Sequence, residues 1–308
     1  MPKYSLVVSE NEKSMRVDKF IADNIEGMNR SKLKAGAVSI KVNGKDEKVS
    51  YKTKAGDSVE VVWEDSVPAN IEAQDIPLDI IYEDDDVTVV NKAQGMVTHP
   101  ASGNWSGTLV NALLFHWKRG KSTDFRPGIV HRLDKDTSGV IITAKNRNAE
   151  EVLQKQIRAH STKKEYILIV SGAPKEKSGV IKTQIIRDPS DRKKFKATTD
   201  TDKGKSAVTY YRCFATYGAY SLIRVRLGTG RTHQIRVHMK YLGCPILGDS
   251  IYGKSDKNFP CATLMLHARR LFIALPSGEK KEFVAPVPRR FKEVLRYLHT
   301  HFAKNFPC

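Results

Sequence analysis

The sequence predicts an α+β fold built from two domains. Short segments rich in β-branched residues are mixed with amphipathic helical segments, and the two kinds follow no regular βα repeat. The chain contains neither a G-x-G-x-x-G sequence nor a Walker sequence, which disfavours a doubly wound nucleotide-binding fold. At 308 residues the chain is longer than most single domains and has room for a sizeable core.

Most of the expected elements lie in the C-terminal two thirds of the chain. The strand candidates are residues 87–91, 139–144, 165–170 and 220–227. The helix candidates are residues 108–118, 148–159 and 233–242, the last of which ends at Gly243. In the fourth strand candidate, Ile223, Val225 and Leu227 alternate with Arg224 and Arg226, which predicts one buried face and one basic face.

Positive charge is concentrated in the C-terminal part of the chain. Residues 1–66 contain 12 Lys/Arg and 11 Asp/Glu, and residues 67–91 contain no basic residue and 7 acidic ones. Residues 92–308 contain 40 Lys/Arg and 16 Asp/Glu, so the net charge of +18 arises there. A basic body predicts a polyanionic partner, with RNA or DNA first and a surface tuned for solubility as the alternative.

The sequence also indicates where the protein works. No apolar run approaches the roughly 18 residues of a membrane helix, and the N-terminus is too short and too charged for a secretory signal. The four cysteines form no C-x-x-C pair, which argues against a zinc site or a disulfide framework. We therefore expect a cytoplasmic protein without a membrane partner.

The most informative stretch is the run from His131 to Gly139, H-R-L-D-K-D-T-S-G. It places the Asp134 carboxylate between two cations and leads directly into the apolar segment 140–144. A carboxylate held in this way can stay ionised in a cleft and still face a substrate. Asp136 is the local alternative.

This run resembles the active-site motif of the RluA-type pseudouridine synthases, which isomerise uridine within RNA. Further segments agree with the family in order along the chain, namely residues 84–100, 128–145, 163–166, 227–238, 248–249 and 266–268. Ala93 stands where the family has a proline. The resemblance implies a catalytic domain over residues 81–308 with a mixed, largely antiparallel sheet. Residues 107–114 favour the type that bears an S4 domain and modifies large-subunit ribosomal RNA.

The resemblance assigns the catalytic carboxylate to Asp134 and its partner cation to Arg231. Pseudouridine formation breaks an N-glycosidic bond, rotates the base and rejoins it through carbon, so we expect no cofactor and no metal. A single carboxylate could attack the sugar or abstract its proton. A phosphate contact is the alternative role for Arg231, and a simple ion pair with a neighbouring cation is the alternative for Asp134.

Three further residues match positions that lie at the target nucleotide in the family. Tyr166 matches the tyrosine that stacks on the base, and Ile235 matches an apolar residue of the base pocket; both could instead be ordinary core residues. Arg132 resembles the arginine that fills the space left by the flipped base. His131 could contact the phosphate backbone or belong to the core.

The N-terminal residues 1–66 resemble an S4 RNA-binding domain, and residues 67–80 are expected to form a linker. Helical spacing over residues 15–25 is followed by the turns Asn43-Gly44 and Gly56-Asp57, typical of a small α/β module. Functionally, the cations Arg30, Lys32 and Lys34 would meet phosphates without reading sequence. The alternative is a solvated basic face.

The leading hypothesis is an RNA pseudouridine synthase that acts as a monomer on a 23S-type ribosomal RNA or an assembling large subunit. A non-catalytic RNA-binding or ribosome-assembly factor on the same fold is the second hypothesis. A metal-dependent nuclease using Asp84, Asp85 and Asp86 is the third, although a turn into a buried strand explains that cluster better. The basic run 192–196 could line the RNA or form a solvated loop.

Overall fold

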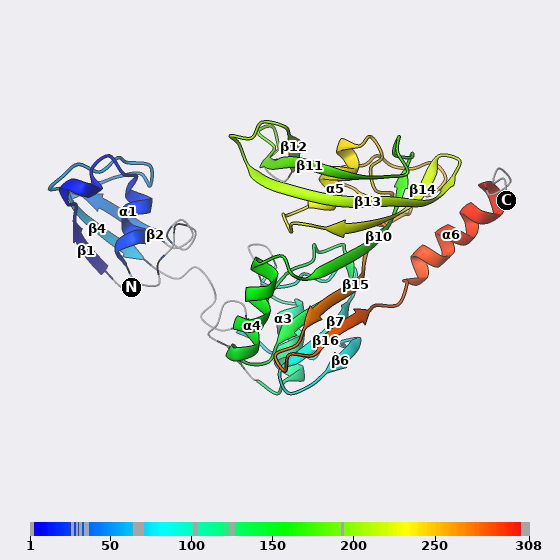
Figure 1. Ribbon diagram of the computed structural model, residues 1–308. Helices are drawn as coiled ribbons and strands as arrows, with labels where there is room; N and C mark the ends of the chain where they lie inside the picture. The colour runs from blue at the N-terminus through cyan, green and yellow to red at the C-terminus, as the bar shows by residue number, and fades with distance from the viewer. Residues whose placement is uncertain are drawn as a thin grey trace. The chain divides into compact units, whose positions relative to one another are not determined.

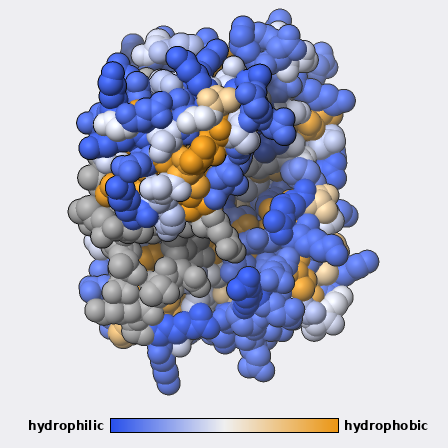
Figure 2. All heavy atoms as spheres, turned by 90° about the vertical axis from the view of Figure 1, so that its left-hand side faces the viewer, coloured by the Kyte–Doolittle hydropathy of each residue, from blue (hydrophilic) through white to orange (hydrophobic). Residues whose placement is uncertain are grey.

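A computed structural model describes residues 3–25, 28, 30, 33, 37–63, 71–100, 104–119, 121–122, 127–191 and 194–302 (Figure 1). The chain divides into two compact units, Met1–Ile71 and Glu72–Cys308. No described helix is long and apolar enough to cross a membrane. On the face drawn in Figure 2, hydrophilic side chains predominate and hydrophobic ones form only small patches.

The first unit contains a four-stranded antiparallel sheet packed against helix α1. Its strands follow the order β1-β4-β2-β3 and comprise β1 (Lys3–Val7), β2 (Ala37–Val42), β3 (Lys45–Asp46) and β4 (Ser58–Trp63). Helix α1 (Val17–Asn24) confirms the helical spacing seen in the sequence, because Val17, Phe20 and Ile21 all enter the core against Val59 and Val61. The identity of this unit as an S4 domain stays a prediction.

The second unit is built on a long mixed sheet whose strands follow the order β12-β11-β13-β14-β10-β15-β9-β7-β6, with β16 paired to β15. These strands are β6 (Ile80–Glu83), β7 (Val87–Lys92), β9 (Ser138–Ala144), β10 (Lys163–Ser171), β11 (Ser178–Arg187), β12 (Phe195–Thr198), β13 (Lys205–Tyr217), β14 (Tyr220–Leu227), β15 (Leu266–Ala274) and β16 (Lys280–Val284). Of the strand pairs described in this sheet, only β9 and β15 run parallel, which confirms the predicted α+β class. A separate two-stranded pair joins β5 (Ile71–Glu72) to β8 (Lys121–Ser122).

The described residues of this unit also form the helices α3 (Leu109–His116), α4 (Arg147–Arg158), α5 (Gln234–Tyr241) and α6 (Arg289–Phe302). The first three confirm the helices predicted from the sequence. The α4 N-terminus is capped by Asn146, whose side-chain oxygen accepts the Ala149 amide at 2.9 Å. Helix α4 packs against β9, and α5 packs against β12 and β13 (Figure 1).

Glycine is required where β9 begins. Gly139 has a φ of +118°, and a Cβ added there would overlap the backbone carbonyl of Ala268 on β15. Only glycine tolerates both the backbone conformation and the close approach. Strand β9 can therefore start alongside β15 immediately after the run 131–138, which fixes where that run lies.

Helix α5 is tied to the sheet through a buried histidine. The His238 ring nitrogens lie 2.8 Å from the Thr209 hydroxyl and 3.0 Å from the Thr183 hydroxyl, and the side chain is fully buried. Burial lowers the pKa of His238 to about 4. The imidazole is therefore neutral in the folded protein near pH 7.

We expect His238 to make the second unit sensitive to acid. Between pH about 6.5 and pH about 4 the unfolded chain binds a proton that the folded chain excludes, so stability falls as the pH is lowered through this window. The loss reaches about 3 kcal/mol, since each unit of pKa difference is worth about 1.4 kcal/mol. Urea unfolding of His238→Gln should show a flatter pH dependence there, whereas the exposed control His299→Gln should keep the wild-type slope.

Candidate active site

Segments far apart in the sequence meet around one cavity in the second unit. The cavity has a volume of about 450 Å³. Three of the motif segments contribute to its wall: the run 130–134, the start of β10, and the loop that joins β14 to α5. The predicted site residues that line it are His131, Arg132, Asp134, Tyr166, Arg231 and Ile235.

Asp134 lies in the loop that precedes β9, with its side chain 18% exposed. The loop closes in a turn in which the Thr137 amide donates to the Asp134 carbonyl at 3.1 Å. Buried Leu133 anchors the other side, because its carbonyl accepts the Thr98 hydroxyl at 2.9 Å. The carboxylate is therefore held by the backbone on both sides while its oxygens remain accessible from the cavity.

A buried lysine, which sequence reasoning did not single out, supports this loop through hydrogen bonds to backbone carbonyls. Lys92 is fully buried, and its Nζ donates to the carbonyls of Ala93, Met96 and Lys135 at 2.9, 2.7 and 3.2 Å. Burial lowers the pKa of Lys92 to about 7, although the Asp134 and Asp136 carboxylates oppose the shift. The lysine thus joins the segment after β7 to the backbone one residue beyond Asp134.

The cation beside Asp134 is Arg236, which corrects the predicted pairing with Arg231. The Arg236 NH1 atom lies 3.7 Å from Asp134 Oδ2, whereas Arg231 Nε donates to the Ser206 carbonyl at 3.0 Å. Among the described residues, no ion pair joins Arg231 to Asp134. Helix phase explains the difference, because Arg236 lies in the first turn of α5 and turns inward, while Arg231 precedes the helix.

Arg236 is fixed by a second carboxylate. Its Nε and NH2 atoms donate to Asp249 at 2.8 and 2.7 Å, and both side chains are buried. Burial is the largest single influence and opposes the charge on each group, but their mutual hydrogen bonds and charge attraction together outweigh it, so the pKa of Arg236 is raised and the pKa of Asp249 is lowered. The guanidinium is therefore a permanent, immobile positive charge at Asp134.

Tyr166 and Ile235 form apolar wall on two sides of the cavity, and both are almost fully buried, at 6% and 5% exposure. Tyr166 lies on β10 with Val225 and Ala268 as its cross-strand partners. Burial, followed by the nearby Asp134 charge, raises the pKa of Tyr166, so its ring stays neutral at all ordinary pH values. A flat neutral ring beside a carboxylate can stack on a nucleobase.

His131 and Arg132 take different places at the cavity. Arg132 is exposed. The His131 Nε2 accepts the Ile142 amide at 3.2 Å, and burial lowers the pKa of His131 well below its usual value. This neutral, internally bonded ring favours the core role over a phosphate contact. Lys164, overlooked in the sequence, also lines the cavity, and burial lowers its pKa to about 8.

The N-terminal cations are only partly described. Arg30 NH2 lies 3.0 Å from the buried Asp18 carboxylate, which also accepts Arg16, so one face of the Arg30 guanidinium is engaged within the unit. About half of the Arg30 side chain remains exposed. Lys32 and Lys34, like Arg192 and Lys193 of the basic run, lie outside the described residues.

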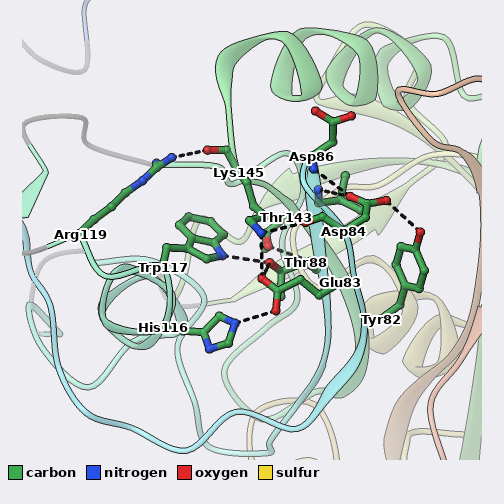
Figure 3. Close-up of polar contacts among 11 residues, drawn as sticks. Tyr82, Glu83, Asp84, Asp86, Thr88, His116, Trp117, Arg119, Thr143 and Lys145 are labelled. Carbon is green, nitrogen blue, oxygen red and sulfur yellow. Dashed lines mark hydrogen bonds and ion pairs between the residues drawn. The ribbon is translucent and has the colours of Figure 1, made fainter.

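The acidic cluster before β7 forms a turn that leads into this buried strand, as the sequence suggested (Figure 3). Asp84 Oδ1 accepts the backbone amides of Asp86 and Val87 at 2.9 and 2.7 Å. Glu83 contacts His116 at 2.8 Å and Lys145 at 3.2 Å. Within the described ranges, no group of three or more His, Cys, Asp or Glu residues is arranged to hold a metal. The nuclease hypothesis therefore lacks a ligand set there.

Comparisons with known proteins agree on one family. The sequence pattern described as "RNA pseudouridylate synthase" matches residues 86–241. The chain is 42% identical to the ribosomal large subunit pseudouridine synthase D of Borreliella burgdorferi, over 94% of this chain and 90% of that protein. It is 39% identical to the protein of the same name from Zymomonas mobilis, over 97% and 98%. Human RNA pseudouridylate synthase domain containing 4 has a similar structure, with a TM-score of 0.58, 27% identity, and 71% and 92% coverage.

Proposed function

Because this chain belongs to the RNA pseudouridylate synthase family and isomerises uridine in RNA, we propose that Asp134 is its catalytic carboxylate and large-subunit ribosomal RNA its substrate. The observation that carries the assignment of Asp134 is its position in the cavity. Its carboxylate lies 3.7 Å from the buried Arg236 guanidinium and lines the same wall as Tyr166.

The reaction needs groups of this kind and little else. The bond between N1 and C1′ breaks, the uracil rotates, and a bond forms between C5 and C1′. The proton on C5 leaves and N1 gains one, so the atoms balance. A carboxylate at the position of Asp134 can act as a nucleophile at C1′ or as a base at C2′. The Arg236 guanidinium lies 3.7 Å from this carboxylate and attracts its negative charge.

The target uridine reaches this cavity outside its base stack. Flipping a nucleotide costs a few kcal/mol and is easiest in loops. We assign stacking on the freed base to the neutral Tyr166 ring, and apolar contact to Ile235. We assign exposed Arg132 to the space that the flipped base leaves. We assign the N-terminal unit, with half-exposed Arg30, to contacts with phosphates elsewhere on the RNA.

One observation supports large-subunit ribosomal RNA as the substrate, and a second supports a nucleic acid in general. Two relatives about 40% identical along nearly the whole chain carry that substrate in their names. Residues 92–308, which contain the cavity, carry a large excess of positive charge. We place the enzyme in the cytoplasm, with which the free thiols of Cys213, Cys244 and Cys261 agree.

The substrate is tested by tritium release from transcripts labelled at uridine C5. We expect the wild-type chain to release tritium from an unmodified large-subunit transcript and not from a small-subunit transcript of similar length. Mapping of the modified positions would then identify the uridines. Equal release from both transcripts, or release only from small RNAs, would contradict the assignment while leaving the isomerase activity intact.

A further inference from the structure

Aromatic and arginine side chains gather on the face of strands β13 and β14 that points away from the cavity. Tyr166, which lines the cavity, is the cross-strand partner of Val225 on β14. Successive side chains on a strand point to opposite faces, so Arg224 and Arg226 lie on the other side of the sheet. The sequence predicted this basic face, but it did not predict the aromatic rings of the neighbouring strand β13.

Each arginine on this face lies over an aromatic ring of β13. Arg226 is the register partner of Tyr210, and its guanidinium carbon lies 4.5 Å from the ring centroid. Arg224 and Arg212 lie 5.1 and 5.8 Å from the centroid of Phe214. These distances are within the range of cation–π contact. Each ring is therefore held in place by at least one guanidinium.

The rings of this face are also open to solvent. Tyr210 is 37% exposed and Phe214 51% exposed, and Val180, the partner of Tyr210 on β11, is 48% exposed. Phe214 lies at a bulge, between Cys213 and Ala215, where the register of β13 against β14 shifts. A bulge changes the direction of a side chain at the expense of regular pairing. Stability of the sheet does not require exposed aromatic rings at these positions.

The charge of this face is complementary to a polyanion. Three arginines contribute to it, and one of them, Arg224, has its Nη1 atom 3.7 Å from Glu165 Oε2. Arginine planes and aromatic rings are the groups on which unpaired nucleobases stack, while the guanidinium charges meet phosphates. A base-paired helix hides its base faces and would not use the rings. The combination of exposed aromatic rings and arginines on this face therefore favours binding of single-stranded RNA over a base-paired helix.

We propose that the outer face of β13 and β14 is a second RNA-binding surface that holds an unpaired segment of the substrate RNA remote from the target uridine. Tyr210 and Phe214 are four residues apart, which is about 14 Å along a strand. That spacing suits bases separated by one or two nucleotides, with Arg212 between them. The inference rests on RNA being the substrate, and adds a contact surface that the cavity does not supply.

The test measures binding of an RNA that the active site cannot convert. A fluorescent oligonucleotide of about twelve adenosines and cytidines contains no uridine, and about 0.2 M salt weakens contacts made by charge alone. The full chain is compared with Tyr210→Ala/Phe214→Ala and with Tyr241→Ala, a control that removes an equally exposed ring at the end of α5. We expect the double variant to bind about tenfold more weakly or worse, and the control to bind as wild type.

The outcomes separate this inference from the proposed function. An affinity for the double variant equal to that of Tyr241→Ala, or no binding by wild type, would overturn it and leave a protein as the remaining kind of partner for this face. Asp134→Asn should bind the oligonucleotide as wild type does. Loss of isomerase activity by the double variant on a minimal hairpin would also count against it, because that substrate reaches only the cavity.

Discussion

Asp134→Asn is expected to release no tritium from uridine-labelled RNA while it binds that RNA with nearly wild-type affinity. The amide keeps the shape of the side chain but can neither attack C1′ nor accept a proton, so turnover should fall by about a thousandfold or more. Folding should be little affected, because Arg236 keeps its bidentate contact with Asp249. The two readouts are the rate of tritium release and the dissociation constant from filter binding.

Asp136→Asn is the matched control for this substitution. Asp136 lies two residues along the same loop, and its backbone carbonyl, rather than its side chain, accepts the Gln94 amide at 2.9 Å. We expect this variant to keep most of the wild-type rate. Activity in Asp134→Asn together with its loss in Asp136→Asn would move the catalytic carboxylate to position 136. Full activity in both variants would place it outside this loop.

Local sequence was sufficient to single out two residues, Asp134 and Tyr166, that the fold brings to one cavity. Asp134 lies in the loop that leads into the apolar strand β9, and Tyr166 begins the apolar run of β10, so the local sequence was enough to recognise both positions. The segments 87–91, 139–144 and 165–170 were recognised as strands for the same reason, and 220–227 was recognised by its alternation of apolar and charged residues. Their residues fit a buried sheet regardless of what surrounds them.

Features that depend on distant contacts were not found in this way. Two arginines five positions apart compete for Asp134, and the choice is made by the start of α5 at Gln234 and by Asp249 farther along the chain. The burial of Lys92 depends on carbonyls that the fold brings together. Strands β11 and β13 and helix α6 were also overlooked. Much of β13 alternates between exposed and half-buried residues, and this weakens the apolar signal of a strand.

Arg236 is the residue whose removal should damage both the fold and the reaction. Arg236→Met leaves the Asp249 carboxylate buried without its partner, and breaking a buried pair in this way costs about 3–5 kcal/mol. Arg231→Met is the matched control, because among the described residues that side chain gives up one hydrogen bond, to the Ser206 carbonyl, worth about 1 kcal/mol. Urea unfolding measures both. A larger loss in Arg231→Met would contradict the geometry described here.

Stability and catalysis by Arg236 can be separated with a second substitution. In Arg236→Met/Asp249→Asn the unpaired charge is gone, while the side-chain oxygen of the introduced asparagine can still accept the amides of Ile251 and Tyr252, which Asp249 accepts at 2.9 and 3.0 Å. We expect the double variant to regain much of the lost stability. It should nevertheless stay slow in tritium release, because Asp134 still lacks the cation 3.7 Å away. Recovery of the rate together with stability would reduce Arg236 to a structural residue, and persistent inactivity in a stable protein would establish that its charge acts on Asp134.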